Sequence, residues 1–263
     1  MSLAPSICAD FQRDGVVALR GIFSEWVEPL RAGLEEVMAA PSPLERSYQP
    51  DGSARFFQDL CNWQRIPAFE DFVRHSPAAG VAADLMGSRT ARFFHDHVLV
   101  KEPGTALPTP WHQDLPYYCV AGSANVSLWI PLDPIPREVC METIAGSHAW
   151  SRIHKPKRFD GSDLYAGDDR TDMPDIDANR EAFPILGWEL QPGDAIAFHF
   201  AAVHGAPAVR PTQGRRRIFS ARWVGDDETF VDRGGKGSPP FAHLTLRDGE
   251  AFDAPDFPLI VSR

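Results

Sequence analysis

From residue 90 onward the chain is a series of short apolar segments separated by turns, and this alternation constrains the fold most. Most of the separating turns contain proline or glycine, as at 102–104, 133–134 and 191–194. Proline accounts for 24 of 263 residues, about 9% against an average near 5%. Because proline breaks long helices and lacks a backbone donor, this part of the chain favours short strands. The predicted strands are 91–101, 123–132, 139–145, 185–190, 194–200, 207–210 and 216–224.

The first third of the chain has a different pattern. Residues 15–23 form a β-branched apolar segment that ends at Ser24. Residues 25–39 repeat apolar side chains at helical spacing, with Ser24 as a candidate N-cap; Pro29 makes this helix start later or bend. Residues 66–87 predict two short helices that are interrupted near Pro77, and Gly87 is suited to close the second.

Many short strands at near-regular spacing are typical of a sandwich, jelly roll or barrel. The chain shows no internal repeat and no linker, so we expect a single domain over 1–263. Its parts are a helical region of about 1–89, a β core of about 90–224 and a C-terminal extension, 225–263. Residues 155–182 are polar and rich in aspartate, which is typical of a lid or mobile loop.

The charge balance restricts the partners. With 26 basic and 36 acidic residues the formal net charge is −10, which argues against nucleic acid or an anionic membrane as the main partner. The N-terminus lacks the pattern of a secretory signal, and four cysteines without a C-x-x-C pair suit a reducing compartment. We therefore expect a cytoplasmic protein that acts on a small molecule; the sequence does not define its oligomeric state.

The stretch from Thr109 to Asp114 carries a candidate metal site. In an extended chain His112 and Asp114 point to the same side and offer one nitrogen and one oxygen ligand. A further histidine would complete the two-histidine, one-carboxylate arrangement of non-haem Fe(II) oxygenases. His204, followed by Gly205, is favoured for this role over His199. A rival interpretation is a cupin-type site that uses His95 and His97.

A dicarboxylate bound to such a metal needs a cation at its far end, and a guanidinium suits this best. The predicted strand 216–224 places Arg216, Ser220 and Arg222 on one face. Arg216 is thus a candidate clamp, Ser220 its hydroxyl partner, and Arg222 a residue that could reach the substrate. The alternative is an exposed basic strand edge.

Five segments together resemble the phytanoyl-CoA dioxygenase family of Fe(II)/2-oxoglutarate-dependent oxygenases. They are VLVKEPGTALPTPWHQDLPYY (98–118), VSLWIPLD (126–133), ETIAGSHAW (142–150), QPGDAIAFHFAAVHGA (191–206) and RRIFSARW (216–223). The resemblance implies a double-stranded β-helix (a jelly roll, cupin-like) with helices outside, mainly β in class.

The resemblance also implies a set of site residues. They are His112, Asp114 and His204 for Fe(II), and Arg216, Trp129 and His97 around 2-oxoglutarate, with O2 as the second cosubstrate. This chain departs from the family pattern after His204, where Ala206 and Pro207-Ala208-Val209 replace more polar residues, and one extra loop residue leaves Arg215 open as the clamp.

Related halogenases lack the carboxylate ligand. Because Asp114 is present, we expect hydroxylation of a small organic molecule, with release of succinate and CO2. The alternatives are a cupin-like metalloenzyme of different chemistry and a non-catalytic jelly-roll binding protein. An aromatic entrance that includes Tyr117, Tyr118 and Trp150, together with Arg222, favours a modest, anionic organic substrate.

Overall fold

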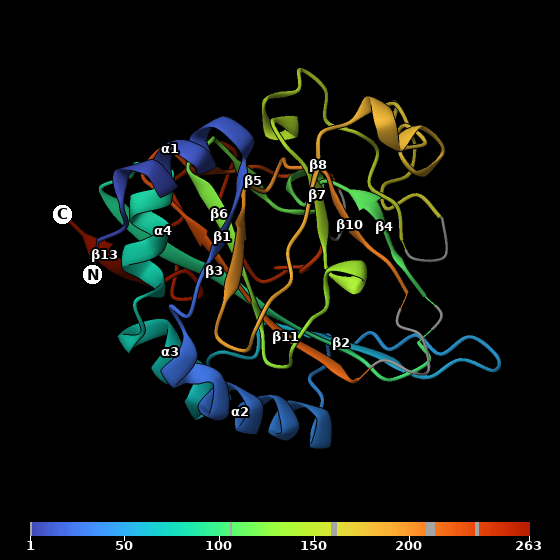
Figure 1. Cartoon of the computed structure of the whole chain (residues 1–263). Coiled ribbons are helices and arrows are strands. Elements are labelled where there is room, and N and C mark those ends of the chain that lie inside the picture. The colour runs from blue at the N-terminus through green and yellow to red at the C-terminus, as the bar shows by residue number, and fades with distance from the viewer. Residues whose placement is uncertain (1, 106, 159–161, 209–213, 235–236) are drawn as a thin grey trace.

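The computed structural model describes residues 2–105, 107–158, 162–208, 214–234 and 237–263. Two antiparallel sheets face each other, and four α-helices lie outside the larger one (Figure 1). This arrangement is the expected jelly roll with flanking helices, and the fold prediction is confirmed.

The major sheet has seven strands. In spatial order they are β1 (Val16–Leu19), β9 (Ala195–Phe198), β6 (Asn125–Pro131), β11 (Arg216–Val224), β3 (Thr90–Lys101) and β13 (Leu259–Ser262), with β2 (Phe56–Leu60) also paired with β3. Strands β3 and β11 are the longest, and their antiparallel pairing runs from Arg216 opposite Lys101 to Val224 opposite Arg92. This pair forms the wall on which the polar face predicted for 216–222 lies.

The minor sheet has four strands in the order β4 (Thr109–His112), β10 (His204–Ala206), β7 (Glu142–Ile144) and β8 (Ile185–Leu186). A separate pair joins β5 (Val120–Ala121) to β12 (Thr229–Phe230). Short 3-10 turns connect several strands: η1 (Ser24–Trp26), η2 (Leu115–Tyr117), η3 (Arg137–Val139), η4 (Ser147–Ala149) and η5 (Asp177–Ala182).

The helices are α1 (Pro5–Asp14), α2 (Val27–Ala39), α3 (Pro67–His75) and α4 (Ala78–Met86). Their apolar faces share one core with the outer face of the major sheet. Phe219 of β11 contacts Phe69 and Phe72 of α3, with ring centroids 4.6 and 5.2 Å apart. Burial of these rings is the main favourable term that fixes the helices on the sheet.

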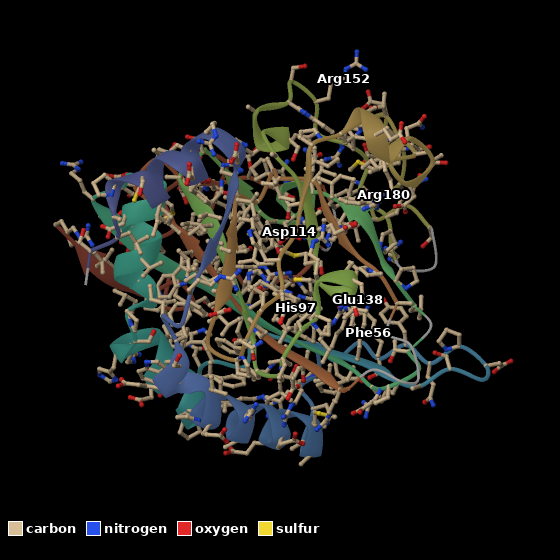
Figure 2. All side chains as sticks on the ribbon, in the orientation of Figure 1. Phe56, His97, Asp114, Glu138, Arg152 and Arg180 are labelled. Atoms are coloured by element: carbon tan, nitrogen blue, oxygen red, sulfur yellow. The ribbon has the colours of Figure 1, made fainter. Side chains whose placement is uncertain are left out.

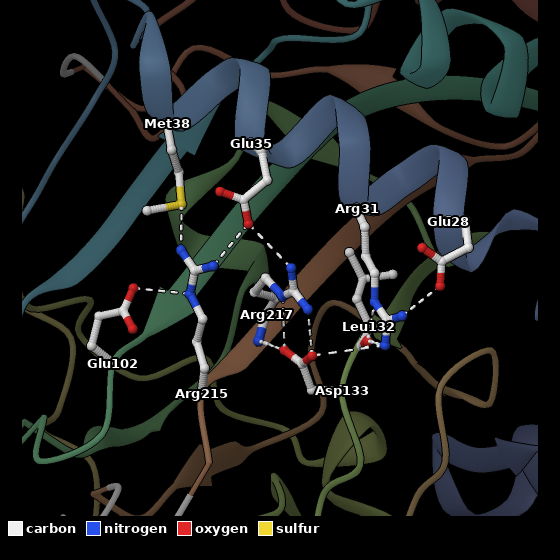
Figure 3. A network of polar contacts seen from close by, with 9 residues as sticks. All are labelled: Glu28, Arg31, Glu35, Met38, Glu102, Leu132, Asp133, Arg215 and Arg217. Carbon is white, nitrogen blue, oxygen red and sulfur yellow. Dashed lines mark hydrogen bonds and ion pairs between the residues drawn. The ribbon is translucent and has the colours of Figure 1, made fainter.

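Helix α2 is also joined to the sheet by a network of ion pairs and hydrogen bonds (Figure 3). Asp133 accepts from the backbone N–H and the guanidinium of Arg217, at 2.9 and 2.7 Å. Glu35 of α2 pairs with Arg217 at 3.1 Å and with Arg215 at 2.8 Å. Arg215 is therefore occupied on the helix side of the sheet.

The N-terminal predictions hold with one exception. The segment predicted as the helix 25–39 starts as η1 and continues as α2, with Pro29 in the first turn, where its missing N–H costs little. Gly87 closes α4 with φ 64°. Ser24 is not a side-chain cap; its hydroxyl donates to Gly21 O at 2.9 Å instead. Helix α1 was not predicted.

The strand predicted at 207–210 is wrong where the structure describes it. The observed strand, β10, ends at Ala206, residues 207 and 208 lie outside any strand, and residues 209 and 210 lie outside the described part. Strands β2 and β13 were not predicted, and β13 builds the end of the C-terminal extension into the major sheet. Across the residues that the structure describes, each helix is too short or too polar to cross a bilayer.

Candidate metal centre

Two histidines from neighbouring strands face each other at the opening of the jelly roll. His112 ends β4 and His204 begins β10, and the two residues are direct partners in the antiparallel register. Their ring centroids lie 4.2 Å apart. Directly opposed side chains of an antiparallel pair lie on the same face of the sheet. The pairing thus explains why residues 92 positions apart in the sequence offer their rings to one point.

Backbone carbonyls fix both rings. Nδ1 of His112 is 2.8 Å from Pro110 O, and Nδ1 of His204 is 3.0 Å from Ala202 O. A carbonyl can only accept, so each Nδ1 carries the proton and each Nε2 has a free lone pair. This is the tautomer that a metal requires. Burial, followed by repulsion from His112, lowers the pKa of His204 to about 4, which keeps this ring neutral at pH 7.

Asp114 supplies the carboxylate. Its Oδ1 is 3.4 Å from Nε2 of His112 and 3.9 Å from Nε2 of His204. The other oxygen, Oδ2, is 3.4 Å from Nη2 of Arg222. Burial alone would raise the pKa of Asp114, but the Arg222 guanidinium holds it well below its usual value. The carboxylate stays ionised, with one oxygen turned toward the two imidazoles.

One ligand atom from each of His112, Asp114 and His204 lies within 4.8 Å of the others. Among the described residues this is the one group of three or more His, Cys, Asp or Glu side chains so arranged. Two neutral imidazoles and one carboxylate on one side of a point match the facial site of non-haem iron enzymes. Figure 2 shows Asp114 in the interior of the molecule, whereas Arg152 and Arg180 project at its periphery.

Gln113 lies between the two ligands in the sequence and points the other way. Its Nε2 donates to Ala201 O at 3.0 Å, and its Oε1 accepts from the backbone N–H of His154 at 2.9 Å. Gln113 is 2% exposed. Its amide therefore joins the metal-binding stretch both to the chain that leads into β10 and to the segment that follows residue 151.

The metal centre opens into a cavity of about 650 Å³ between the two sheets. This volume lies within the roughly 300–1,000 Å³ of small-molecule sites. One side is closed by the covering segment, which we define as residues 152–158 and 162–183. Lys157 of this segment is anchored to Tyr117, whose hydroxyl donates to Lys157 O at 2.7 Å and accepts from Lys157 N at 3.0 Å. The segment predicted as a lid thus lies over the site.

Arg216 lies in the wall of this cavity, and Arg215 does not. Arg216 is 6% exposed, its Nη1 donates to Val139 O at 2.5 Å, and its Nε has no partner among the described residues. Burial lowers the pKa of Arg216 to about 10. Arg215 pairs with Glu102 at 2.9 Å and with Glu35, on the helix side. Strand alternation separates the two arginines, as expected.

Lys101 is a second buried cation beside Arg216, and sequence reasoning missed it. The two residues are register partners on β3 and β11, and Lys101 is 1% exposed. Its Nζ donates to Leu107 O at 2.8 Å and lies 4.7 Å from the ring centroid of Phe56. Burial, reinforced by Arg216, lowers its pKa well below the usual value. No described carboxylate lies within ion-pair distance of either cation.

The other predicted cosubstrate residues lie on the same wall. Trp129 and His97 line the cavity. Ser220 is the register partner of both, one on each side of β11. Its hydroxyl is fully buried and has no hydrogen-bond partner among the described residues.

The remaining histidine candidates lie away from the triad. His199 is held by two hydrogen bonds, from its Nε2 to Ser123 O at 3.0 Å and from the backbone N–H of Ala201 to its Nδ1 at 3.0 Å. His95 and His97 line the cavity, but they do not belong to a metal-binding group in the described part of the chain. The structure therefore favours His204 as the third ligand.

A jelly roll that carries a two-histidine, one-carboxylate centre at its open end defines the class of non-haem metal oxygenase folds. The family model for phytanoyl-CoA dioxygenase (PhyH) matches residues 11–218, and the chain belongs to this family of Fe(II)/2-oxoglutarate-dependent oxygenases. A "probable phytanoyl-CoA dioxygenase" of Caenorhabditis elegans is 26% identical over an alignment of 171 residues, and the match covers 61% of this chain. It covers 52% of that relative, so the chain spans about half of the relative's length.

Solved structures share the fold over almost the whole chain. The non-heme alpha ketoglutarate dependent carbocyclase SnoK from nogalamycin biosynthesis has a TM-score of 0.77 at 24% identity, covering 98% of this chain and 97% of SnoK. The epimerase SnoN from the same biosynthesis has a TM-score of 0.75 at 22% identity, with 98% and 96% covered. EctD from S. alaskensis has a TM-score of 0.67 at 18% identity, with 85% and 77% covered.

Proposed function

We propose that the protein is an Fe(II)- and 2-oxoglutarate-dependent dioxygenase that hydroxylates a small organic molecule and releases succinate and CO2. The observation that carries the proposal is the combination of the His112, Asp114 and His204 triad with an uncompensated pair of buried cations in one cavity. Family membership supports the same class of reaction. The four free thiols are consistent with the reducing compartment that we expect.

The donor set fits iron. Both Nε2 atoms are deprotonated because carbonyls hold the Nδ1 protons, and Asp114 is ionised. Arg222 occupies Oδ2 of Asp114 and so favours binding of the metal through Oδ1 alone. Three protein ligands on one side leave the opposite side for a bidentate cosubstrate and O2. Bound iron would supply the activation of O2 that is coupled to oxidative decarboxylation of 2-oxoglutarate.

The cation pair fits the distal carboxylate of 2-oxoglutarate. Arg216 and Lys101 are both buried, and a buried charge without a partner is costly. The free Nε of Arg216 and the unpartnered hydroxyl of Ser220 are donors of the kind that a carboxylate would accept from. We assign Arg216 as the clamp, with Lys101 beside it, Ser220 as a hydroxyl donor further along β11, and Trp129 and His97 as walls of the cosubstrate site.

The chain itself orients the reactants and excludes water. The covering segment contributes the apolar side chains of Leu164 and Met173 to the lining of the cavity. A site closed in this way strengthens each electrostatic contact inside it. Since the carboxylate ligand Asp114 is present, hydroxylation is the proposed outcome. The names of SnoK and SnoN show that this fold also carries carbocyclase and epimerase reactions. Chemical identification of the reaction product therefore distinguishes hydroxylation from these two reactions.

The test is an anaerobic titration of Fe(II) and 2-oxoglutarate into the purified protein, followed by succinate release in air with a substrate panel. We expect a weak visible charge-transfer band in the wild type and its loss, with loss of succinate, in Asp114→Ala. Asp172→Ala, which removes an exposed carboxylate at the cavity mouth, is the matched control. Normal succinate formation by Asp114→Ala would overturn the proposal.

A further inference from the structure

The cavity has the opposite charge from the molecule as a whole. The chain has a formal net charge of −10, yet among the residues that the structure describes seven basic side chains line the cavity against two carboxylates. The basic side chains are Arg46, Lys101, Lys155, Lys157, Arg158, Arg216 and Arg222, and the carboxylates are Asp114 and Asp172. One of these carboxylates is the proposed iron ligand and the other pairs with Lys157 at 2.9 Å. Lys155 also pairs with Asp163, at 3.5 Å. The basic side chains left without a described carboxylate are Arg46, Lys101, Arg158 and Arg216, and their positive charge remains for ligands to neutralise.

2-Oxoglutarate does not neutralise all of it. Its proposed anchor, Arg216 with Lys101, lies at one end of the β3–β11 pair, and Arg222 opposite His95 lies near the other. Arg216 and Arg222 are six residues apart in one strand, roughly 20 Å at ~3.4 Å per residue. Arg222 contacts the proposed metal ligand Asp114 at 3.4 Å, so 2-oxoglutarate bound to the metal would extend from there toward Arg216 and place its distal carboxylate at Arg216 and Lys101. Arg46, the amide of Gln58 and the free Nη1 of Arg222 remain for a second ligand in the same cavity.

The cavity wall formed by β2, β3 and β11 contains buried polar groups without partners, and each of the three side chains that carry them offers at least one donor. Nη1 of Arg222, Nε2 of Gln58 and both ring nitrogens of His95 are buried and unpartnered among the described residues. Arg222, Gln58 and His95 are 5%, 5% and 1% exposed. A buried donor without an acceptor costs free energy, so a cluster of them in a cavity wall points to a ligand that accepts.

Arg46 adds an uncompensated charge to this wall. Its backbone N–H donates to Gln58 O at 2.8 Å, which places it beside β2, and its Nη1 donates to the neutral hydroxyl of Ser238 at 3.0 Å. Within the described chain Arg46 makes no ion pair with a carboxylate. Gln58 in turn accepts from Nε2 of His97 at 3.1 Å, which leaves its amide N–H2 as the free group. The charged guanidinium of Arg46 and the neutral amide donor of Gln58 thus lie on the same side of the cavity.

The opposite side of the same space is apolar and aromatic. Trp111, Tyr117, Leu164 and Met173 line it. Such a wall suits a hydrocarbon or aromatic group, and Trp and Tyr add flat contact surface. The metal centre lies between this apolar side and the donor wall, since Asp114 contacts Arg222 and the ring of His112 is 5.9 Å from that of Tyr117.

We propose that the substrate is a small amphipathic organic anion, whose carboxylate or phosphate binds Arg46, Gln58 and Arg222 while its apolar body lies against Trp111, Tyr117 and Leu164. This inference rests on the proposed function and specifies the substrate class of that site. The anion is held at the β2 side of the cavity, and the reacting C–H lies between the anion and the apolar wall, beside the metal. Arg46 and Gln58 are specificity-determining residues.

The test uses protein loaded with Fe(II) and 2-oxoglutarate in the absence of O2, titrated in a calorimeter with three probes. The probes are 3-phenylpropanoate, 3-phenylpropyl phosphate and 3-phenylpropanamide, which share one body and differ in the polar end. We expect at least one anion to bind about tenfold or more tightly than the amide, the usual effect of a charge-assisted hydrogen bond. Which of the two binds better separates a carboxylate substrate from a phosphate one.

Two variants and one control locate the effect. Arg46→Gln removes the charge and Gln58→Glu reverses the polarity of the wall at nearly constant shape; both should abolish the preference for the anion. Arg55→Gln is the matched control, because Arg55 lies next to β2 outside the cavity and pairs with Glu45 at 3.0 Å. It should keep the preference.

The inference is overturned if neither anion binds, if the amide binds as tightly as both anions, or if the preference survives both variants. The loading step keeps the two proposals apart. If Fe(II) and 2-oxoglutarate bind normally and the anion preference is missing, only the substrate class is wrong. If the wild type does not bind Fe(II) with 2-oxoglutarate, the proposed function itself fails.

Discussion

His112 and His204 are opposed across the β4–β10 pair, with ring centroids 4.2 Å apart and both Nδ1 atoms bound to backbone carbonyls. The strand register thus sets the positions of the two proposed nitrogen ligands. The tautomer leaves the Nε2 lone pair of each ring free for the metal. The register shifts directly after His204, where a bulge separates it from Ala206. If the register of β10 against β4 were shifted by one residue at His204, the ring would point to the other face of the sheet.

Replacement of His204 by alanine should remove metal binding. A lost ligand is expected to weaken Fe(II) affinity by more than about 100-fold, because loss of an outer-shell partner alone costs 10–100-fold. Calorimetric or fluorescence titration with Fe(II) under anaerobic conditions measures it. His199→Ala is the control, since His199 binds only backbone groups. Equal losses in both variants would contradict the assignment.

Replacement of Arg216 by alanine should weaken 2-oxoglutarate binding and leave metal binding intact. Loss of a charged hydrogen-bond partner costs about 1.5–3 kcal/mol, roughly 10- to 150-fold in Kd. Titration of 2-oxoglutarate into the Fe(II) protein gives the value. Arg215→Ala should keep the wild-type affinity, because Arg215 pairs with Glu35 and Glu102 outside the cavity. The reverse result would move the clamp to Arg215.

Lys101→Met should weaken the binding of 2-oxoglutarate without lowering the stability of the ligand-free protein. The ammonium of Lys101 is buried beside Arg216 without a carboxylate, so its removal relieves repulsion in the ligand-free protein. We expect the Tm of the free protein to be unchanged or higher, and the rise in Tm on adding 2-oxoglutarate to be smaller than in the wild type. A full ligand-induced rise in Lys101→Met would rule out contact between Lys101 and the cosubstrate.

Glu228 should make the protein less stable above neutral pH. Burial raises its pKa to about 7, although the hydrogen bond from Asn125 at 2.8 Å opposes the shift. The folded state therefore holds a proton that the unfolded state, with an ordinary pKa near 4.3, has released. Stability falls as pH rises through this window, and the full cost is present above pH 7.

Glu228→Gln imitates the protonated side chain and removes this cost. At pH 8 the variant should be more stable than the wild type by about 1–3 kcal/mol, and near pH 4 the two should be equal. Denaturant unfolding at both pH values measures the difference. A variant that is less stable at pH 8 would show that the carboxylate is compensated in the folded state.

The sequence predicted those parts of the fold that local patterns determine. Turns with proline and glycine separated β3, β6, β9 and β11, and Gly87 marked the end of α4. Strand β2 was missed because Gln58 and Asp59 interrupt its apolar residues; both are buried by partners far away in the sequence. Ser24 failed as a cap because a 3-10 turn precedes α2.

The candidate site also contains residues that local sequence patterns predict and residues that they do not. His112 and Asp114 could be found because they are two residues apart in the sequence, and strand alternation was enough to place Arg215 and Arg216 on opposite faces. Lys101 could not be found in this way. A lysine at the end of a strand normally reaches solvent, and its burial here results from the loop through Thr105 and Leu107 and from Arg216 on the neighbouring strand.

Gln113 gives the site a property that the ligands alone would not have. Its amide holds Ala201, which leads into β10, and His154, at the start of the covering segment. The side chains before and after it are proposed to grip the metal. Binding or release of the metal ion would thus be transmitted through residues 112–114 to the covering segment. Exchange of the ion would in this way be coupled to the access of solvent to the cavity.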